Sequence, residues 1–110
     1  MAIQSKEVVS SRNYEIHLIE ILEYSLEIFG HTQTCIYFHK ISQYVERLDS
    51  SYLTYPECRH LATKSRMYRN IILDAHLIIY RITTKRIEVL DIIHSASSIR
   101  KIQNVRKIRL

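Results

Sequence analysis

Residues 66–94 read RMYRNIILDAHLIIYRITTKRIEVLDIIH, and this stretch decides the fold. It contains three apolar, β-branched runs, at residues 67–73, 76–82 and 86–93. Runs of this kind, bounded by polar residues, are typical of β-strands. The two breaks between the runs, at residues 74–75 and 83–85, are short enough for hairpin turns. The stretch therefore predicts three strands paired in an antiparallel meander.

Successive side chains of a strand point to opposite faces, so the middle run has two distinct sides. One side carries His76, Ile78, Tyr80 and Ile82. The other side carries Leu77, Ile79 and Arg81. We expect the side of His76 and Tyr80 to face the core or the helices.

Upstream, residues 12–29 and 33–48 show the apolar spacing of two amphipathic helices. The expected buried positions are Tyr14, Leu18, Ile21, Leu22, Ser25, Ile28 and Phe29 on the first helix, and Phe38, Ile41, Val45 and Leu48 on the second. Gly30, the single glycine, is expected to end the first helix with a positive φ, and Thr32 to cap the second. This three-residue connection makes the helices antiparallel neighbours. Residues 2–9 predict a first strand, followed by capping hydroxyls at Ser10 and Ser11.

The order of these elements, together with two strand motifs, resembles a known family. The motifs are HLIIYRI at residues 76–82 and IEVLDIIH at residues 87–94. They fit a strand ending in Tyr-Arg-Val or similar, a polar hairpin, and a strand ending in an apolar pair before His. Over residues 3–95 the chain resembles the RelE/ParE superfamily of bacterial toxins. The resemblance implies an α+β fold, with a helical hairpin packed on a small antiparallel sheet in the order β-α-α-β-β-β.

The charge of the chain is unevenly distributed. Residues 1–99 hold eleven basic and eleven acidic residues, so the net charge of +5 resides in the last eleven residues. Residues 59–86 add a second imbalance, with seven basic residues against Asp74 alone, whereas acids concentrate in the first helix. We expect one acidic and one basic side, and the basic side suits a polyanion or an acidic protein segment.

The tail, residues 98–110, extends beyond a toxin domain assigned to residues 1–97. Its apolar residues recur every three positions, at Ile99, Ile102, Val105 and Ile108. This spacing predicts an extra C-terminal basic amphipathic helix, capped by Ser97 or Ser98. Such a helix can cover a sheet edge, contact nucleic acid or an acidic partner, or do both. A membrane-surface helix is a further alternative.

One branch of the superfamily cleaves messenger RNA on the ribosome. That chemistry needs a base for the 2′-hydroxyl, cations for the phosphorane and an acid for the leaving oxygen. The nuclease branch commonly has an arginine at the position of Leu77 and basic residues at the positions of SASS, residues 95–98. It often also has a tyrosine or histidine near the C-terminus, whereas in this chain no tyrosine follows Tyr80. We therefore assign no catalytic residues and lean away from an enzyme. An endoribonuclease using Arg66, Arg69, Arg81 and His94, with the ribosome and mRNA as partners, is the alternative.

An apolar residue at position 77 is more typical of the ParE branch, whose members bind DNA gyrase and trap its cleaved complex with DNA. The resemblance thus implies the toxin of a type II toxin–antitoxin, plasmid-stabilisation system, which inhibits gyrase through a basic sheet face and the tail. The expected target or nucleic-acid contacts are Arg66, Arg69, Arg81, Lys85, Arg100, Lys101, Arg106 and Lys107. A third alternative is an inactive member that only binds its antitoxin.

The resemblance also implies a cognate antitoxin, whose C-terminal segment covers the helical hairpin and adds to a sheet edge. Tyrosines are good anchors for such a contact. The expected antitoxin contacts are Tyr37, Tyr44, Tyr52 and Tyr55. The assembly is open between a homodimer and a heterotetramer with the antitoxin.

Other function classes find little support in the composition. No apolar run approaches the roughly 20 residues needed to span a bilayer, and the N-terminus lacks the apolar region of a signal peptide. We expect a cytoplasmic protein without a membrane partner, in which Cys35 and Cys58 are reduced thiols. The six histidines show no ligand spacing beside Cys or Asp, so neither a metal nor another cofactor is expected.

Overall fold

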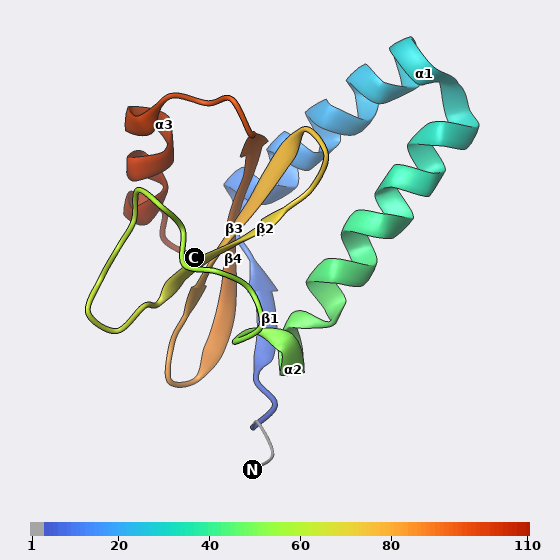
Figure 1. Cartoon of the computed structure of the whole chain (residues 1–110). Helices are drawn as coiled ribbons and strands as arrows, with labels where there is room; N and C mark the ends of the chain where they lie inside the picture. The colour runs from blue at the N-terminus through green and yellow to red at the C-terminus, as the bar shows by residue number, and fades with distance from the viewer. Residues whose placement is uncertain (1–3) are drawn as a thin grey trace.

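The computed structural model describes residues 4–110 and has the expected α+β architecture (Figure 1). Its elements are β1 (Glu7–Ser10), α1 (Arg12–Glu46), α2 (Leu48–Ser51), β2 (Tyr68–Ile72), β3 (His76–Ile82), β4 (Arg86–His94), α3 (Ile99–Asn104) and the 3-10 turn η1 (Val105–Lys107). The three strands of the meander begin and end within one residue of the predicted limits. The predicted first strand is shorter than expected, and its residues 2 and 3 lie outside the described part of the chain.

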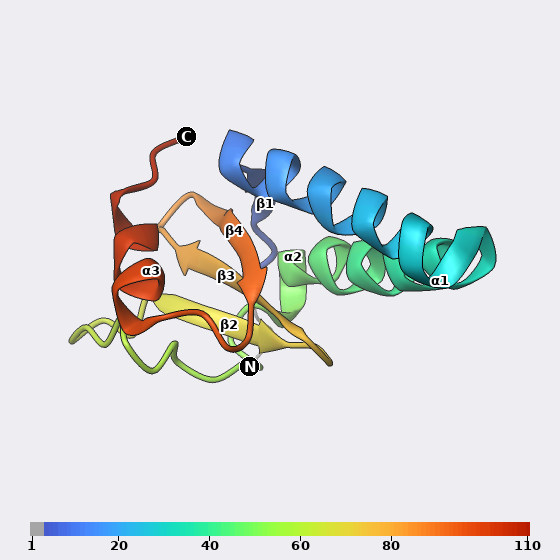
Figure 2. The ribbon, with the colours of Figure 1, turned by 90° about the horizontal axis from the view of Figure 1, so that it is seen from above.

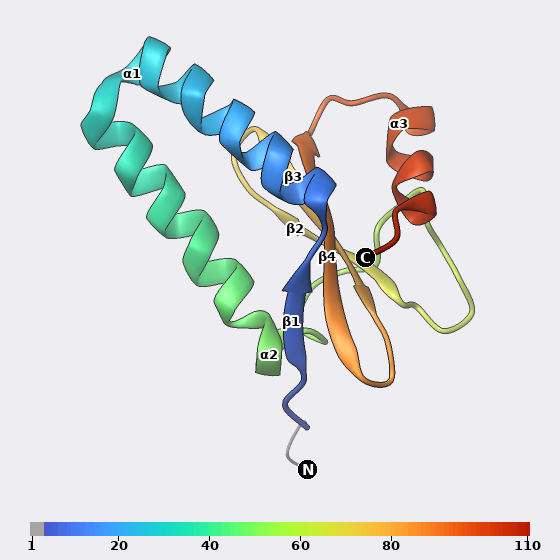
Figure 3. The same ribbon diagram turned by 180° about the vertical axis from the view of Figure 1, so that it is seen from behind.

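The sheet is mixed, and not wholly antiparallel as expected. Its strand order is β1-β4-β3-β2, with β2–β3 and β3–β4 antiparallel and β1 parallel to β4. The helical hairpin explains this direction, because it returns the chain to the end of the sheet from which β1 started (Figure 3). After the hairpin, three antiparallel strands leave β4 running in the direction of β1, with Val8 paired to Ile87.

The helical hairpin turns at a single residue. The backbone of α1 is helical except at Gly30, where φ is 83° and ψ is 177° and the helix is kinked. The positive φ was predicted, but this ψ lies outside the left-handed helical region and is accessible almost only to glycine. The predicted three-residue connection is therefore wrong, and Thr32 lies within the second leg of the helix. The buried Thr34 hydroxyl braces the turn, 2.8 Å from the Gly30 carbonyl oxygen and 2.9 Å from the Ser25 hydroxyl.

The main core lies between the hairpin and one face of the sheet. It contains Tyr14, Ile41 and Leu48 from the helices, and Ile71, Ile78, Tyr80, Ile87, Val89 and Ile92 from the strands. Ser11 joins the two layers, since its hydroxyl accepts a hydrogen bond from the Tyr14 amide and donates one to the Leu90 carbonyl. The predicted side of His76, Ile78 and Tyr80 does face the hairpin.

Three predicted core positions are exposed. Ile28, Phe29 and Phe38 have exposed fractions of 54%, 63% and 46%. Phe38 lies on the second leg, next to Tyr37, which contacts His76 of the sheet. Ile28 and Phe29 directly precede the Gly30 turn, and this end of the hairpin projects beyond the sheet (Figure 2). No strand lies beneath the tip to cover them, although their helical spacing matches that of the buried residues.

The C-terminal segment covers the second face of the sheet, not an edge. Ile102 and Val105 are buried in a second core with Cys58, Leu61, Tyr68, Ile79, Leu90 and Ile93. The Ser98 hydroxyl caps α3 by accepting a hydrogen bond from the Lys101 amide, as predicted. Because α3 and the hairpin sandwich the sheet, the expected free basic sheet face does not exist (Figure 2).

Candidate functional site

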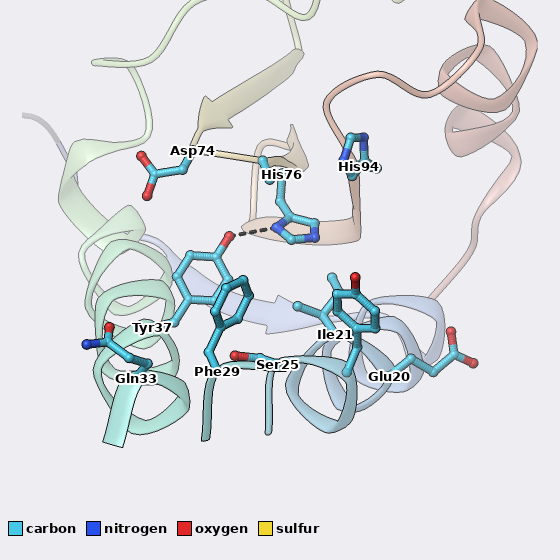
Figure 4. A pocket seen from close by; sticks show the side chains of 11 residues that line it. Glu20, Ile21, Ser25, Phe29, Gln33, Tyr37, Asp74, His76 and His94 are labelled. Carbon is cyan, nitrogen blue, oxygen red and sulfur yellow. Dashed lines mark hydrogen bonds between the residues drawn. The ribbon is translucent and has the colours of Figure 1, made fainter. Parts of the chain in front are cut away.

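A groove of about 760 Å³ opens where the hairpin projects past the sheet (Figure 4). One wall comes from both legs of α1, and the other from the β2–β3 turn and the end of β4. The lining residues are Glu20, Ile21, Tyr24, Ser25, Phe29, Gln33, Tyr37, Asp74, Ala75, His76 and His94. The volume falls in the range of ligand-binding clefts, and its helical wall is largely apolar.

The helical wall continues into a larger apolar surface at the tip of the hairpin. Tyr24 and Phe29 line the groove and are each 63% exposed. Ile28, which precedes Phe29 in the sequence, is 54% exposed, and Phe38 on the second leg is 46% exposed. Soluble monomers rarely expose contiguous apolar patches without an interaction partner. The tip and groove together therefore leave apolar side chains open to solvent, and this surface is the candidate contact site for a partner.

The sheet wall of the groove is polar. The Tyr37 hydroxyl lies 2.7 Å from Nδ1 of His76, and the rings of His76 and His94 are 5.8 Å apart between centroids. Burial lowers the pKa of His76 below its usual value, and the neighbouring His94 lowers it further. His94 accepts a hydrogen bond from the Ala96 amide on Nδ1, so the proton of its neutral form resides on Nε2. The groove thus combines an apolar wall with an imidazole pair that can hydrogen bond.

A family model identifies the class of protein. The model for the ParE toxin of the type II toxin–antitoxin system parDE matches residues 9–99. The chain belongs to the ParE toxin family. No curated protein shows a significant match to it.

A solved structure described as the chromosomal ParDE TA system from P. aeruginosa has the same fold as this ParE-family chain. The two chains superpose with a TM-score of 0.68 at 15% sequence identity, over 83% of this chain and 97% of that one. At this identity the similarity concerns the fold alone.

Two of the arginines predicted for target binding have partners within this ParE-family protein. Arg81 pairs with Glu88 at 2.6 Å and also donates to the Ile108 carbonyl at 3.3 Å, which ties the tail to the sheet. Burial would raise the pKa of Glu88, but its hydrogen bonds with Arg81 and Arg86 outweigh burial and lower that pKa. Arg69 donates to the carbonyls of Leu53 and Tyr55, so it holds the loop before β2 in place.

The other predicted basic contacts point outward. Lys85 is exposed in the β3–β4 turn. Arg66 is exposed just before β2, with an unusual positive φ of 54°. The exposed tail residues are Arg100, Lys101, Arg106 and Lys107.

The alternative nuclease residues do not form one cluster. Arg81 faces Glu88 near the beginning of β4, whereas His94 ends that strand opposite His76. Six residues of strand at about 3.4 Å each place His94 roughly 20 Å from the Arg81 end of the sheet. His94 instead belongs to the groove, at the opposite end of β4 from Arg81.

The four predicted antitoxin tyrosines have different surroundings. Tyr37 lines the groove. Tyr44 and Tyr55 are half-buried and stack edge to face at 6.3 Å, and Tyr55 stacks in the same way on Tyr80. Tyr52 is buried and donates a hydrogen bond to the Gln4 carbonyl at 2.7 Å. The groove therefore involves Tyr37, the alternative catalytic residue His94, and residues that the sequence analysis placed in the core or left unassigned.

Within residues 4–110, no group of three or more His, Cys, Asp and Glu side chains is arranged to hold a metal ion. The helices in the same part of the chain are not long and apolar enough to cross a bilayer.

Proposed function

We propose that this ParE-family protein is the cytoplasmic toxin of a type II toxin–antitoxin system that stabilises plasmids. In this proposal it inhibits DNA gyrase by binding it, and a cognate antitoxin holds it inactive. The main support is the family match over residues 9–99, because inhibition of gyrase is the activity that the ParE resemblance implies.

The geometry favours inhibition by binding over cleavage of RNA. Phosphodiester cleavage needs cations and a proton-transfer group gathered around one phosphate. Arg69 and Arg81 donate to loop carbonyls and to Glu88, and His94 is far from both. The nuclease alternative would need these groups to break their internal contacts before they could reach a substrate.

The groove supports the antitoxin half of the proposal. An amphipathic segment of a partner can bury its apolar side against Tyr24 and Phe29 while its polar groups meet His76 and His94. Recognition of a helix in a groove follows this pattern, with apolar anchors at helical spacing. The antitoxin would then cover the apolar tip that the toxin alone leaves exposed to water.

A gyrase assay tests the proposal. Purified protein is incubated with gyrase, ATP and supercoiled plasmid, and in parallel with translating ribosomes. Accumulation of linear plasmid after protein denaturation supports gyrase trapping. Cuts in ribosome-bound message, with plasmid unaffected, would replace the proposal by the nuclease alternative. Harmless expression without antitoxin, together with no effect in either assay, would favour an inactive family member.

A single variant sharpens this comparison. His94 is exposed, and replacing it by Gln removes the imidazole that the nuclease alternative requires. Under the proposal, His94→Gln retains gyrase inhibition and toxicity. Loss of toxicity in this variant, with folding and gyrase binding unchanged, contradicts inhibition by binding.

A further inference from the structure

The loop before β2 and the C-terminal segment lie side by side on the face of the sheet away from the hairpin. Cys58 and Leu61 of the loop share the second core with Ile102 and Val105 of the tail. Figures 1 and 2 both show the loop running beside α3. Two segments far apart in the sequence thus lie next to each other on one side of the molecule, which we name the basic face.

The basic face is defined by eight exposed cations. They are Arg59, Lys64 and Arg66 from the loop, and Arg100, Lys101, Arg106, Lys107 and Arg109 from the tail. No ion pair among residues 4–110 involves any of them. Residues 58–73 and 92–110, which supply this surface, contain no Asp or Glu. Glu57, two residues before Arg59, is the nearest acid in the sequence, so most of these cations have no carboxylate close to them along the chain.

Most apolar residues of the tail are turned inward, whereas Ile99 and Leu110, towards its two ends, are 54% and 44% exposed. Ile102 and Val105 are buried, and Ile108 packs partly against the same core. Between the cations the surface offers amides and hydroxyls, such as those of Gln103, Asn104 and Ser65, which are exposed. Docking of an acidic protein segment relies on buried apolar or aromatic anchors in addition to charge. Phosphate groups need only the cations and hydrogen-bond donors that this face presents.

We propose that the basic face binds the phosphate backbone of duplex DNA, without regard to base sequence. Duplex DNA carries about one negative charge per 1.7 Å of helix axis, so it can offer several phosphates to a side of the molecule with many cations. Five of the eight cations are arginines, whose planar guanidinium can donate two parallel hydrogen bonds to one phosphate. In the setting of the proposed function, the DNA would be the segment held by gyrase.

The hairpin, which supplies the helical wall of the groove, and α3, which carries part of the basic face, cover opposite faces of the sheet (Figure 2). A partner segment in the groove therefore leaves the basic face open. We expect the toxin to bind DNA equally well when the groove is occupied. DNA contact and neutralisation by an antitoxin are then separate properties of the molecule.

Fluorescence anisotropy with a labelled duplex and the full purified chain tests this inference. If six phosphates are contacted, the dissociation constant should rise roughly a thousand-fold between 50 and 200 mM salt. The double variant Arg106→Gln/Lys107→Gln should lower the magnitude of the slope of log K against log salt by about 1.8, the value expected for the loss of two phosphate contacts. The matched control is Lys40→Gln/Arg47→Gln, which removes one lysine and one arginine from the second leg of α1 and its C-cap, across the sheet. The control should retain the wild-type slope.

Three outcomes overturn the inference. They are no binding of the duplex at 50 mM salt, an equal loss of slope in both double variants, or displacement of the duplex by a polyglutamate peptide at lower concentration than by unlabelled DNA. The last outcome would assign the face to an acidic protein. If Arg106→Gln/Lys107→Gln fails to fold by circular dichroism, Arg100→Gln/Lys101→Gln takes its place with the same expected slope.

The gyrase assay separates this inference from the proposed function. Wild-type protein that traps gyrase but does not bind free duplex would overturn the DNA-binding face and leave the proposed function intact. Wild-type protein that binds duplex with the expected slope but leaves gyrase unaffected would overturn the proposed function and leave the DNA-binding face intact.

Discussion

The Tyr37 hydroxyl lies 2.7 Å from Nδ1 of His76, and this contact joins the second leg of the hairpin to the sheet at the edge of the groove. The two rings are tilted by 45° with centroids 5.8 Å apart. Both residues are half-buried, so the contact stabilises the projecting hairpin and shapes the groove at once. Replacing Tyr37 by Phe should lower the free energy of unfolding by about 1 kcal/mol, the net value of one such hydrogen bond. Urea denaturation measures the change. Gln33→Ala, on an exposed position of the same groove wall, is the control and should have little effect.

His76 should also make stability depend on pH. Burial and His94 lower its folded-state pKa, so the folded protein binds fewer protons on this group than the unfolded chain. His76 therefore does not lower the free energy of unfolding above the unfolded-state pKa of 6.5. It lowers that free energy as the pH falls from 6.5 through the lowered folded-state pKa, because protonation then favours the unfolded chain. His76→Gln should therefore reduce the loss of stability between neutral and mildly acidic pH, measured by denaturation at several pH values. A pH profile parallel to that of the wild type would contradict this assignment.

Glu88→Gln should destabilise the protein strongly. The Glu88 side chain is 9% exposed and pairs with Arg81 at 2.6 Å and Arg86 at 2.7 Å. Removing its charge leaves the half-buried Arg81 guanidinium without its carboxylate partner, which costs about 3 kcal/mol. Because the folded-state pKa of Glu88 is lowered, this stability is present above the unfolded-state pKa of 4.5 and is lost as pH falls through the folded value. Thermal and urea denaturation check both effects, and Glu46→Gln, exposed in α1, should be nearly neutral.

Gly30→Ala should weaken the hairpin for a backbone reason. A Cβ at position 30 would meet nothing within 4 Å, so no neighbouring atom opposes it. The cost comes from φ 83° with ψ 177°, a conformation that a residue with a Cβ adopts at about 1–3 kcal/mol. Unchanged unfolding free energy in Gly30→Ala would show that the turn can be made in another conformation.

Phe29→Ser should weaken antitoxin binding without destabilising the toxin. Phe29 is 63% exposed, so the fold gains little from it, and the unfolding free energy should change by less than about 0.5 kcal/mol. As an apolar anchor in the groove it should contribute about 2 kcal/mol to binding, or roughly thirty-fold in the dissociation constant. Calorimetric titration with the cognate antitoxin measures the effect. Ile19→Ser is the matched control, because Ile19 is 56% exposed on the same leg but outside the groove. Equal losses in the two variants would place the antitoxin elsewhere.

Several features followed directly from the residues. The β2–β3–β4 meander was predictable because Ile- and Leu-rich runs separated by two or three polar residues have few other ways to pair their backbone N–H and C=O groups in hydrogen bonds. The positive φ at Gly30 was predictable because a single glycine interrupted a long helical pattern. The Ser98 cap and the buried Ile102 and Val105 followed from a threefold apolar spacing.

The projection of the hairpin tip beyond the sheet could have been predicted from the length of the helix and the width of the sheet. The first leg of α1 spans residues 12–29, about 27 Å at 1.5 Å per residue. Four strands at about 4.8 Å spacing make a sheet only about 14 Å wide between its outer strands. Periodicity assigned Ile28 and Phe29 to the core because it records which face of a helix is apolar, and not whether anything lies opposite that face.

Local pattern thus determined the strands, the hairpin and the ParE resemblance, since each depends on residues close together in the chain. Tertiary structure alone decided which arginines are free. The sequence does not distinguish Arg81 from Arg66, but only Arg81 pairs with Glu88. The β3–β4 register places Arg81 and Glu88, seven residues apart, directly opposite each other on neighbouring strands. It also decided that the tail covers a sheet face and that loop and tail share one basic surface. Such contacts join distant segments, and no local periodicity encodes which distant segment will be the partner.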